Sequence, residues 1–320
     1  MLRGTGHFNQ DLAGGFRPIF QGPSWLHSAP VTHSIYEFGG GADAMLLAAG
    51  RGERMRPLTD HYPKPLLTVR GLPLLSYPLR GLLRAGVGSV VINTGWLGDQ
   101  IEPALGDSFP RVDPDFNSGA QLTSGRLGLL YSHEGRGAGE ALETAGGIVR
   151  ALPLLKDVFW VAAGDVFAPD FDFSLGLVKH FNASKALAHL WLVPNPAHNP
   201  QGDFGLSGEG LALNLPRPTT TTLNSADANT CSLTGTGATS ASDDAPRYTF
   251  STIALYKKAF FSEVRCGIPT GNPQSVKAPL APLLRRAMDE GLVTASLYQG
   301  LWVDVGTPER LAHLNERPFA

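Results

Sequence analysis

The sequence predicts an α/β fold, a three-layer sandwich in which helices cover both faces of a mostly parallel central sheet. One pattern in the sequence leads to this fold class. Short apolar runs of strand length alternate along the chain with stretches of helical periodicity. Such an alternation implies right-handed crossovers between parallel strands. Ligands of these sheets bind outside the carboxyl ends of the strands, so functional residues are expected in the loops that follow strands.

The individual elements follow from the same periodicities. Strands are predicted at 44–48, 89–93, 127–131, 158–163 and 186–193. Helices are predicted at 74–85, 97–105 and about 141–152, the first two closed by Gly86 and Gly106. A last helix is expected at 307–315, where Thr307 would cap it and Pro308 would take its first position.

Composition marks where this domain begins and where it is interrupted. Residues 1–43 are rich in Gly, Pro and His and show no sustained periodicity, so they are predicted to form a flexible N-terminal extension. Residues 216–247 are dominated by Thr, Ser, Ala, Asn and Gly. They have too little apolar surface to offset the entropy lost on ordering. The chain is therefore expected to form one domain at 44–320, interrupted by a disordered insertion at 216–247.

The bulk composition excludes several classes of protein. The 320 residues are 42% hydrophobic, enough for a sizeable core without disulfides or metals. The formal charge of −2 provides no basic field for nucleic acid. Cys231 and Cys266 lack the spacing of a zinc site or of a disulfide framework. No apolar run approaches the roughly 18 residues of a membrane span, and the first residues lack the apolar segment of a signal peptide. A cytoplasmic protein that binds neither nucleic acid nor membrane is predicted.

The first predicted strand leads directly into a glycine-rich loop, A-A-G-R-G-E-R-M-R-P-L-T at 48–59. Small residues at a strand exit let the backbone approach a ligand closely, with N–H groups free for phosphate oxygens. A Walker A loop would need a lysine after its second glycine, and a dinucleotide fingerprint would need a small residue where Met55 stands. The pattern thus predicts a phosphate-binding loop of another kind. A tight glycine turn with solvated arginines is the structural alternative.

Lys64 lies shortly after this loop in the run Y-P-K-P-L at 62–66. The flanking prolines fix φ on both sides and hold the lysine backbone extended. A lysine restrained in this way reaches a phosphate with less entropy to lose. An ordinary loop lysine in a proline-rich turn gives the same pattern.

Two aspartates follow apolar runs and are candidate metal ligands. Asp165 comes directly after the strand predicted at 158–163, and Asp304 follows a short apolar run near the end of the chain. Mg²⁺ uses only one or two carboxylates when phosphate oxygens and water supply its other ligands. A turn residue after a strand and an aspartate in the turn before a helix are the alternatives.

Together these segments resemble the signature of a known enzyme family. L-x-x-G-x-G-x-R-M-x-P-L-T followed by P-K-P-L, then G-D-x and W-x-D-x-G-T-x-E in this order, resemble the motifs of the sugar-1-phosphate nucleotidyltransferases. The resemblance implies the Rossmann-like nucleotide-diphospho-sugar transferase fold. It also implies a reaction in which an NTP and a sugar 1-phosphate give an NDP-sugar and pyrophosphate, carried out by a monomer or a small homo-oligomer.

The resemblance also implies roles for single residues. Arg54 and Lys64 would hold phosphates as the catalytic residues, and Asp165 and Asp304 would bind a Mg²⁺ cofactor. The nucleotide would be bound by the glycine-rich loop and by the turn of the segment E-A-L-E-T-A-G-G-I at 140–148, that is, by Ala48, Ala49, Gly50, Gly52, Thr144 and Gly146. A glycine-rich helix start that serves packing alone is the alternative for the turn.

The sugar-binding residues are less well defined by pattern. Asn93 and Asp203 are candidates, although a strand-end turn residue and a hairpin acid explain them as well. His198 is predicted to be an ordinary loop histidine. Thr252 stands where members of the family usually have a small Gly in the sugar pocket.

Within the family, three strings are similar to the N-acetylmuramate 1-phosphate uridylyltransferases of peptidoglycan recycling. They are E-A-L-E-T-A-G-G-I-x-x-A-L-P-L-L, N-P-A-H-N-P-x-G-D-F at 195–204 and A-P-L-L-R-x-A-M at 281–288. UTP and N-acetylmuramate 1-phosphate are therefore the expected substrates. Guanylyltransferases for mannose or heptose 1-phosphate share much of the pattern and remain an alternative, as does a non-catalytic sugar-nucleotide sensor.

Overall fold

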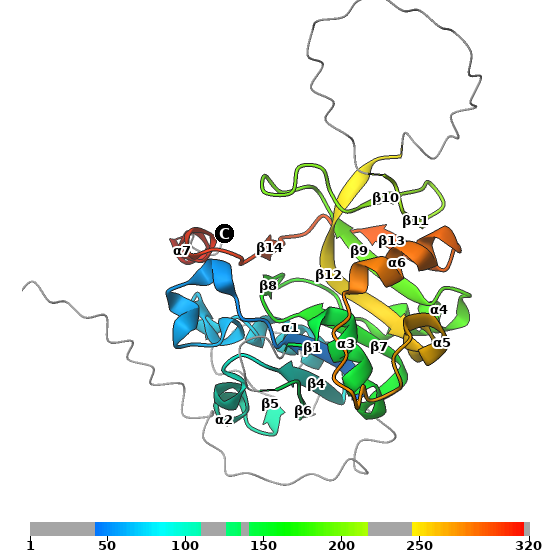
Figure 1. Ribbon diagram of the computed structural model, residues 1–320. Coiled ribbons are helices and arrows are strands. Elements are labelled where there is room, and N and C mark those ends of the chain that lie inside the picture. The colour runs from blue at the N-terminus through cyan, green and yellow to red at the C-terminus, as the bar shows by residue number, and fades with distance from the viewer. Residues whose placement is uncertain (1–41, 110–125, 136–140, 217–244, 317–320) are drawn as a thin grey trace, which may run out of the picture.

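In the computed structural model, which describes residues 42–109, 126–135, 141–216 and 245–316, a ten-stranded mixed sheet runs through the molecule (Figure 1). Most of the predicted extension at 1–43 and of the predicted insertion at 216–247 lies outside the described residues. The predicted C-terminal ends of both segments, residue 43 for the extension and residue 247 for the insertion, differ from the structure. Ala42 and Asp43 already belong to the first strand, and Arg247 begins a long strand of the sheet. Backbone pairing with distant strands extends these elements beyond what local composition indicates.

The centre of the sheet is parallel, as predicted. β1 (Ala42–Ala48) lies between β4 (Ser89–Thr94) and β7 (Leu155–Ala163), and β4 also pairs in parallel with β6 (Leu127–His133). These four strands confirm four of the predicted ones. Because they run in parallel, their carboxyl ends meet at one edge of the sheet.

The rest of the sheet is mainly antiparallel. β12 (Arg247–Lys257) pairs antiparallel with β7 and carries β9 (Ala188–Val193), the fifth predicted strand. The remaining strands are β10 (Phe204–Leu206) and β11 (Ala212–Leu213) beyond β12, β13 (Val293–Leu297) beside β9, and β5 (Ser108–Phe109) beside β6. Two small sheets pair β2 (Thr68–Val69) with β3 (Leu72–Pro73) and β8 (Val166–Phe167) with β14 (Val303–Asp304).

Seven α-helices in the described residues surround this sheet (Figure 1). They are α1 (Ser76–Arg84), α2 (Ile101–Leu105), α3 (Glu143–Ala151), α4 (Leu175–Ala183), α5 (Glu263–Cys266), α6 (Leu280–Asp289) and α7 (Pro308–Glu316). The predicted helix at 97–105 is divided, since a 3₁₀ turn at Gly98–Gln100 precedes α2. None of the helices in these residues combines the length and the apolar character needed to cross a bilayer.

Alternate side chains of β1 build the two faces of the sandwich. Leu46 belongs to the core cluster that contains α1 and α4 side chains, whereas Met45 belongs to the cluster that contains α3 and α6 side chains. Both residues are fully buried, as expected for a central strand covered on both faces. The predicted three-layer arrangement is therefore confirmed.

A third, smaller core anchors the glycine-rich loop. Met55, fully buried, packs in a cluster with Phe167 of β8, Val305 and Leu314 of α7. The methionine that argues against a dinucleotide fingerprint is thus a packing residue. Because of this contact, the loop after β1 and the C-terminal segment around Asp304 are held next to each other.

Candidate active site

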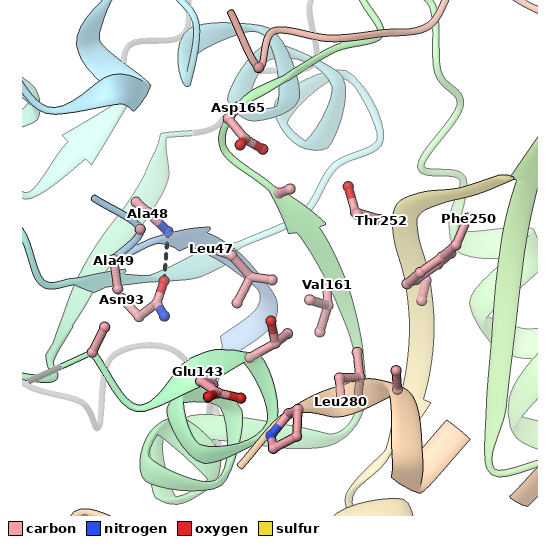
Figure 2. A pocket seen from close by; sticks show the side chains of 18 of the residues that line it. Leu47, Ala48, Ala49, Asn93, Glu143, Val161, Asp165, Phe250, Thr252 and Leu280 are labelled. Carbon is pink, nitrogen blue, oxygen red and sulfur yellow. Dashed lines mark hydrogen bonds between the residues drawn. The ribbon is translucent and has the colours of Figure 1, made fainter. Parts of the chain in front are cut away.

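A cavity of about 820 Å³ lies at the carboxyl ends of the parallel strands (Figure 2). One half is lined by the loop after β1, the end of β7 and the start of α3, and the other half by β10, β12 and α6. Ten of the predicted site residues line it: Ala48, Ala49, Gly50, Gly52, Arg54, Lys64, Asn93, Thr144, Asp165 and Asp203. Gly146 and Asp304 are not among its lining residues.

The glycine-rich loop is shaped by a tight turn at Gly52. This residue has a φ of +66°, and a Cβ there would lie 3.1 Å from Thr59 Cγ2 and 3.2 Å from Lys64 Cδ. The Gly52 carbonyl accepts hydrogen bonds from Met55 N and Thr59 Oγ1, both at 2.8 Å. Glycine is therefore required both by backbone conformation and by space. Gly50, which also lines the cavity, is different, because a Cβ at that position would meet no atom within 4 Å.

Lys64 and Asp165 form an ion pair in the cavity. Lys64 Nζ lies 2.5 Å from Asp165 Oδ2, and the lysine side chain is only 9% exposed, against 36% for the aspartate. The two residues come from segments 101 positions apart, so only the fold brings them together. A buried ammonium held by one carboxylate at a strand end is well placed to bind a second anion, such as a phosphate.

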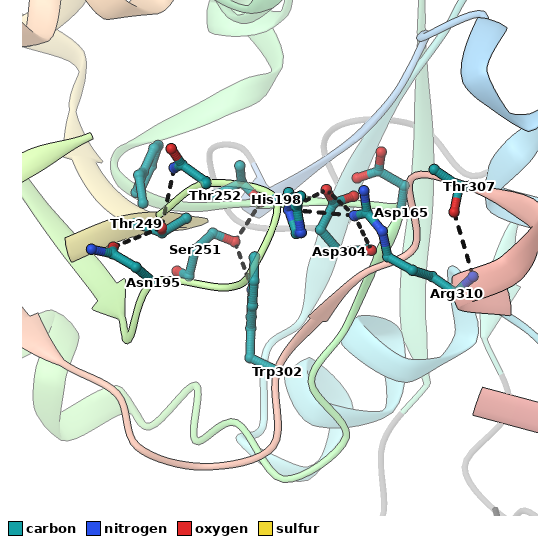
Figure 3. Close-up of polar contacts among 12 residues, drawn as sticks. Asp165, Asn195, His198, Thr249, Ser251, Thr252, Trp302, Asp304, Thr307 and Arg310 are labelled. Carbon is teal, nitrogen blue, oxygen red and sulfur yellow. Dashed lines mark hydrogen bonds and ion pairs between the residues drawn. The ribbon is translucent and has the colours of Figure 1, made fainter. Parts of the chain in front are cut away.

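Asp304 lies beside this pair but outside the cavity lining (Figure 3). The pairing of β14 with β8 sets Asp304 opposite Val166, and Val305 N donates to the Asp165 carbonyl at 3.1 Å. Asp304 Oδ2 is held by Arg310 Nη1 at 2.7 Å and by His198 Nε2 at 3.3 Å. The histidine that the sequence indicates as an ordinary loop residue thus contacts a predicted metal ligand.

Arg54 lies near Asp304, beside the space above Gly306 Cα that a side chain would fill. A Cβ on Gly306 would lie 3.0 Å from Asp304 Oδ1, 3.1 Å from Arg310 Nη1 and 3.2 Å from Arg54 Nη2. Three charged groups therefore converge on one glycine at the cavity wall. The absence of a side chain at Gly306 leaves the room in which they meet.

The two aspartates fit a divalent cation that is also bound by substrate. Each has one carboxylate oxygen engaged by a cation, and its other oxygen, Oδ1, accepts no hydrogen bond from the described residues. No group of three or more His, Cys, Asp or Glu among these residues forms a complete metal site. Two carboxylates completed by phosphate oxygens and water are the usual ligands of Mg²⁺ in such sites.

Glu134 is a site residue that sequence analysis missed. It lines the cavity, where Oε1 accepts from Asn93 Nδ2 at 2.5 Å and Oε2 accepts from Leu142 N at 2.8 Å. Asn93 Oδ1 in turn accepts from Ala48 N at 2.7 Å. The network joins the end of β1 to the turn before α3. Its signal in the sequence is an acid just after a predicted strand, the same logic that identifies Asp165.

The same network gives a prediction about pH. Burial raises the pKa of Glu134 above its ordinary value of 4.5, while the bonds from Leu142 and Asn93 and the nearby Arg150 act in the opposite direction. Between pH 4.5 and the raised pKa of Glu134, the folded protein binds more protons than the unfolded chain. The free energy of unfolding therefore falls as pH rises across that window. We expect Glu134→Gln to remove this part of the pH dependence in urea unfolding measured from pH 4 upward.

The variant has a second expected effect and a simple control. Asn93 Nδ2 and Leu142 N both donate, and an amide accepts through only one of its two terminal atoms, so Glu134→Gln should also be less stable overall. Glu209→Gln, the same change at an exposed residue, is the control. An unchanged slope of stability against pH in Glu134→Gln would contradict the assignment.

Thr144 and Gly146, the two nucleotide-binding residues predicted in the segment at 140–148, both lie in the first turns of α3 but have different surroundings. Thr144 lines the cavity. Gly146 instead packs on the segment before α6: its N–H donates to the Ala278 carbonyl at 3.1 Å, and a Cβ on it would lie 2.6 Å from the Val276 carbonyl oxygen. This close packing leaves no room for a side chain at Gly146, and the residue does not line the cavity.

The two predicted sugar-binding residues are both engaged in hydrogen bonds within the protein. Asn93 uses both ends of its amide: Oδ1 accepts from Ala48 N (Figure 2), and Nδ2 donates to Glu134. Asp203 accepts from Phe250 N at 2.9 Å through Oδ2 and from Asn199 Nδ2 at 3.2 Å through Oδ1. Both side chains line the cavity, and their internal bonds fix their orientation there.

Thr252 lines the other half of the cavity in a strained conformation. Its φ is +62°, at an irregularity of β12 where the register with β9 shifts between Phe250 and Ala254. A β-branched residue with this φ is an outlier. The position at which the family usually has glycine is therefore one where the backbone favours glycine.

We expect Thr252→Gly to raise the free energy of unfolding by about 1 kcal/mol. Relief of about 1–2 kcal/mol of left-handed strain exceeds the roughly 0.5–1 kcal/mol of chain entropy that glycine adds to the unfolded state. Urea unfolding at constant pH measures the change. Thr252→Ala retains a Cβ and should gain little, so an equal gain in both variants would argue against backbone strain.

Comparisons with known proteins agree with this geometry. A model of the nucleotidyl transferase family matches residues 43–207. The chain is 41% identical to N-acetylmuramate alpha-1-phosphate uridylyltransferase of Neisseria meningitidis serogroup B, over 84% of this chain and 94% of the relative. It is 30% identical to the protein of the same name from Caulobacter vibrioides, over 76% of this chain and 95% of that relative.

A solved structure is similar in fold. It is described as a glucose-1-phosphate thymidylyltransferase from Bacillus anthracis in complex with sucrose, and it matches with a TM-score of 0.55 and 19% identity, covering 87% of this chain and 97% of that chain. At this identity the match concerns the fold alone. The family model and the two relatives reach further, and on their evidence the chain belongs to the nucleotidyl transferase family.

Proposed function

We propose that the chain transfers the uridylyl group of UTP to N-acetylmuramate 1-phosphate, giving UDP-N-acetylmuramate and pyrophosphate in peptidoglycan recycling. The observation that carries the proposal is the convergence of the glycine-rich loop, Lys64 and Asp165 on one cavity at the strand ends. The identity of 41% with the N. meningitidis uridylyltransferase supports the choice of substrates.

The proposed reaction is an in-line displacement at phosphorus. An oxygen of the sugar phosphate attacks the α-phosphorus of UTP, the bond from the α-phosphorus to the oxygen bridging it to the β-phosphorus breaks, and that oxygen leaves with its electron pair as part of pyrophosphate. A sugar phosphate is largely ionised at neutral pH, since its second pKa is about 6, so no general base is required. Catalysis then depends on positioning and on neutralising charge.

The loop after β1 and two cations would bind the triphosphate. Backbone N–H groups around Gly50 and Gly52 would donate to phosphate oxygens. The open space beside Gly50 would leave room for these oxygens. Arg54 and Lys64 would stabilise the charge that develops on the phosphates as the bond breaks. We assign both residues a catalytic role.

Asp165 and Asp304 would hold Mg²⁺, which supplies charge neutralisation on the phosphates when bound. For Asp304 to act as a ligand, Arg310 and His198 would have to share its carboxylate with the cation, since both contact Oδ2. Its Oδ1 faces the Gly306 side, where Arg54 also lies. That side is where we propose the metal and the phosphates meet.

The remaining assignments divide the cavity between base and sugar. Thr144 would contact the nucleobase, with Glu134 holding the turn that carries it. Asn93 and Asp203 would border the sugar. We propose that the transferase domain begins at Ala42 and continues through α7, with the insertion predicted at 216–247 lying within it.

Pyrophosphate release measured over a panel of NTPs and sugar 1-phosphates, with Mg²⁺, tests the proposal. Release confined to UTP with N-acetylmuramate 1-phosphate is expected. Release with GTP and mannose or heptose 1-phosphate would replace the substrates and retain the mechanism. No release from any pair, together with binding of a UDP-sugar, would indicate a sensor and overturn the enzymatic assignment.

A further inference from the structure

One cation of the cavity lies away from the glycine-rich loop. Arg285 of α6 lines the half formed by β10, β12 and α6, together with Leu280, Ala281 and Leu284 of the same helix face. The spacing of these four residues places them on one side of a helix. Apart from Arg285, the α6 residues that line the cavity are apolar.

The hydrogen-bond partners of Arg285 are neutral. Its Nη1 donates to Asn214 Oδ1 at 2.7 Å and its Nη2 donates to the Asp203 carbonyl at 3.4 Å, while Cζ lies 5.2 Å from the centre of the Phe204 ring. No carboxylate of the described residues forms an ion pair with it. Lys64, by contrast, is paired with Asp165. Arg285 is thus a half-buried cation with no direct ion pair in the described part of the chain; the carboxylate of Asp289 is separated from it by Asn214, whose Nδ2 donates to both Asp289 oxygens at 3.0 and 3.1 Å.

This arrangement favours an anionic group in the ligand. A guanidinium has five N–H donors, and two of them are used in the bonds to Asn214 and Asp203. A cation against an apolar wall loses hydration that neutral acceptors only partly replace, and a carboxylate restores it through a short bidentate contact. The bond to Asn214 fixes the orientation of the Arg285 guanidinium before a ligand binds, which reduces the side-chain entropy lost on ligand binding.

We propose that Arg285 is a specificity-determining residue that binds the carboxylate of the lactyl ether in N-acetylmuramate 1-phosphate. The inference rests on the proposed function, which sets the triphosphate at the loop after β1 and has the sugar border Asp203, whose carbonyl Arg285 contacts. N-acetylmuramate differs from N-acetylglucosamine by this lactyl group, whose carboxylate is the one anionic centre of the sugar besides its phosphate. A neutral sugar 1-phosphate offers Arg285 no such partner.

Steady-state kinetics at saturating UTP test the proposal. The wild type, Arg285→Met and Arg285→Lys are compared on N-acetylmuramate 1-phosphate and on the same compound with its lactyl carboxylate converted to an amide. The wild type should prefer the carboxylate, and Arg285→Met should reduce that preference, as a ratio of kcat/KM values, roughly 10- to 100-fold. Arg285→Lys should fall between them because an ammonium lacks the planar fork.

The control is Arg286→Met, the same substitution at the next residue of α6. Arg286 is exposed and does not line the cavity, so the preference should equal that of the wild type. Thermal unfolding of each variant shows whether it folds. If Arg285→Met loses activity equally on both compounds, Arg285 serves the fold alone and the proposal is wrong.

The wild-type arm separates this proposal from the one it rests on. A wild type that forms no product from N-acetylmuramate 1-phosphate fails the proposed function before any variant is considered. A wild type that forms product from the carboxylate and the amide at equal rates retains the proposed function and overturns the role of Arg285.

Discussion

Lys64→Ala is expected to lower turnover by roughly 10²–10³-fold, the loss typical when one charge-stabilising contact to the reacting group is removed. The reason is its position: the side chain is almost fully buried, and Lys64 and its ion-pair partner Asp165 both line the cavity. Pyrophosphate release at saturating UTP and sugar 1-phosphate measures kcat directly. Wild-type turnover in this variant would remove Lys64 from the catalytic residues.

The chain provides a matched control for this prediction. Lys156 Nζ lies 2.6 Å from Asp43 Oδ1, an ion pair of similar length that does not line the cavity. Lys156→Ala removes a lysine and leaves an aspartate unpaired, as Lys64→Ala does. Its turnover should stay close to that of the wild type, because this partly buried pair lies outside the cavity and contacts no substrate. Equal losses in both variants would indicate a general effect on folding.

Asp165→Asn is the second substitution with a large expected effect. It preserves the size of the side chain and removes the charge, so it deletes one of two proposed metal ligands as well as the partner of Lys64. We expect turnover to fall roughly 10²–10³-fold and the Mg²⁺ concentration for half-maximal rate to rise. Rates measured over a series of Mg²⁺ concentrations give both quantities.

The Mg²⁺ series also distinguishes a metal ligand from a simple ion-pair partner. If Asp165 only neutralises Lys64, the variant should unfold at a lower temperature, with an unchanged Mg²⁺ requirement. Asp172→Asn, at an exposed residue seven positions on that does not line the cavity, is the control. A normal Mg²⁺ requirement in Asp165→Asn would contradict the metal assignment.

The half of the cavity around the parallel strands was predictable because its determinants are local. Apolar runs of strand length identify β1, β4 and β7, and the glycine-rich loop, Asn93 and Asp165 end or directly follow these strands. Parallel strands bring their carboxyl ends to one edge, so residues far apart in the sequence meet there. Gly52 was predictable for the same reason, since its turn needs a residue that tolerates positive φ.

The other half was not predictable in this way. The glycine-containing loop at 207–211 indicates the hairpin of β10 and β11, but no local signal indicates that β12 pairs with β10 and with β7, strands that are distant in the sequence. Glu134 is bonded to Asn93, 41 positions away, and Arg285 is bonded to Asn214, 71 positions away. Local patterns carry no information about such partners.

The sequence by itself therefore determined the family, the strand–helix alternation and the candidates for phosphate contact, because motif spacing and periodicity are properties of neighbouring residues. Only the tertiary structure decided which candidates share a cavity. In the structure Gly146 packs against Ala278 outside the cavity lining, Asp304 is bonded by Arg310 and His198, and Arg285 has no direct ion pair among the described residues. Those outcomes depend on long-range packing and on burial, which set the surroundings of each charged group.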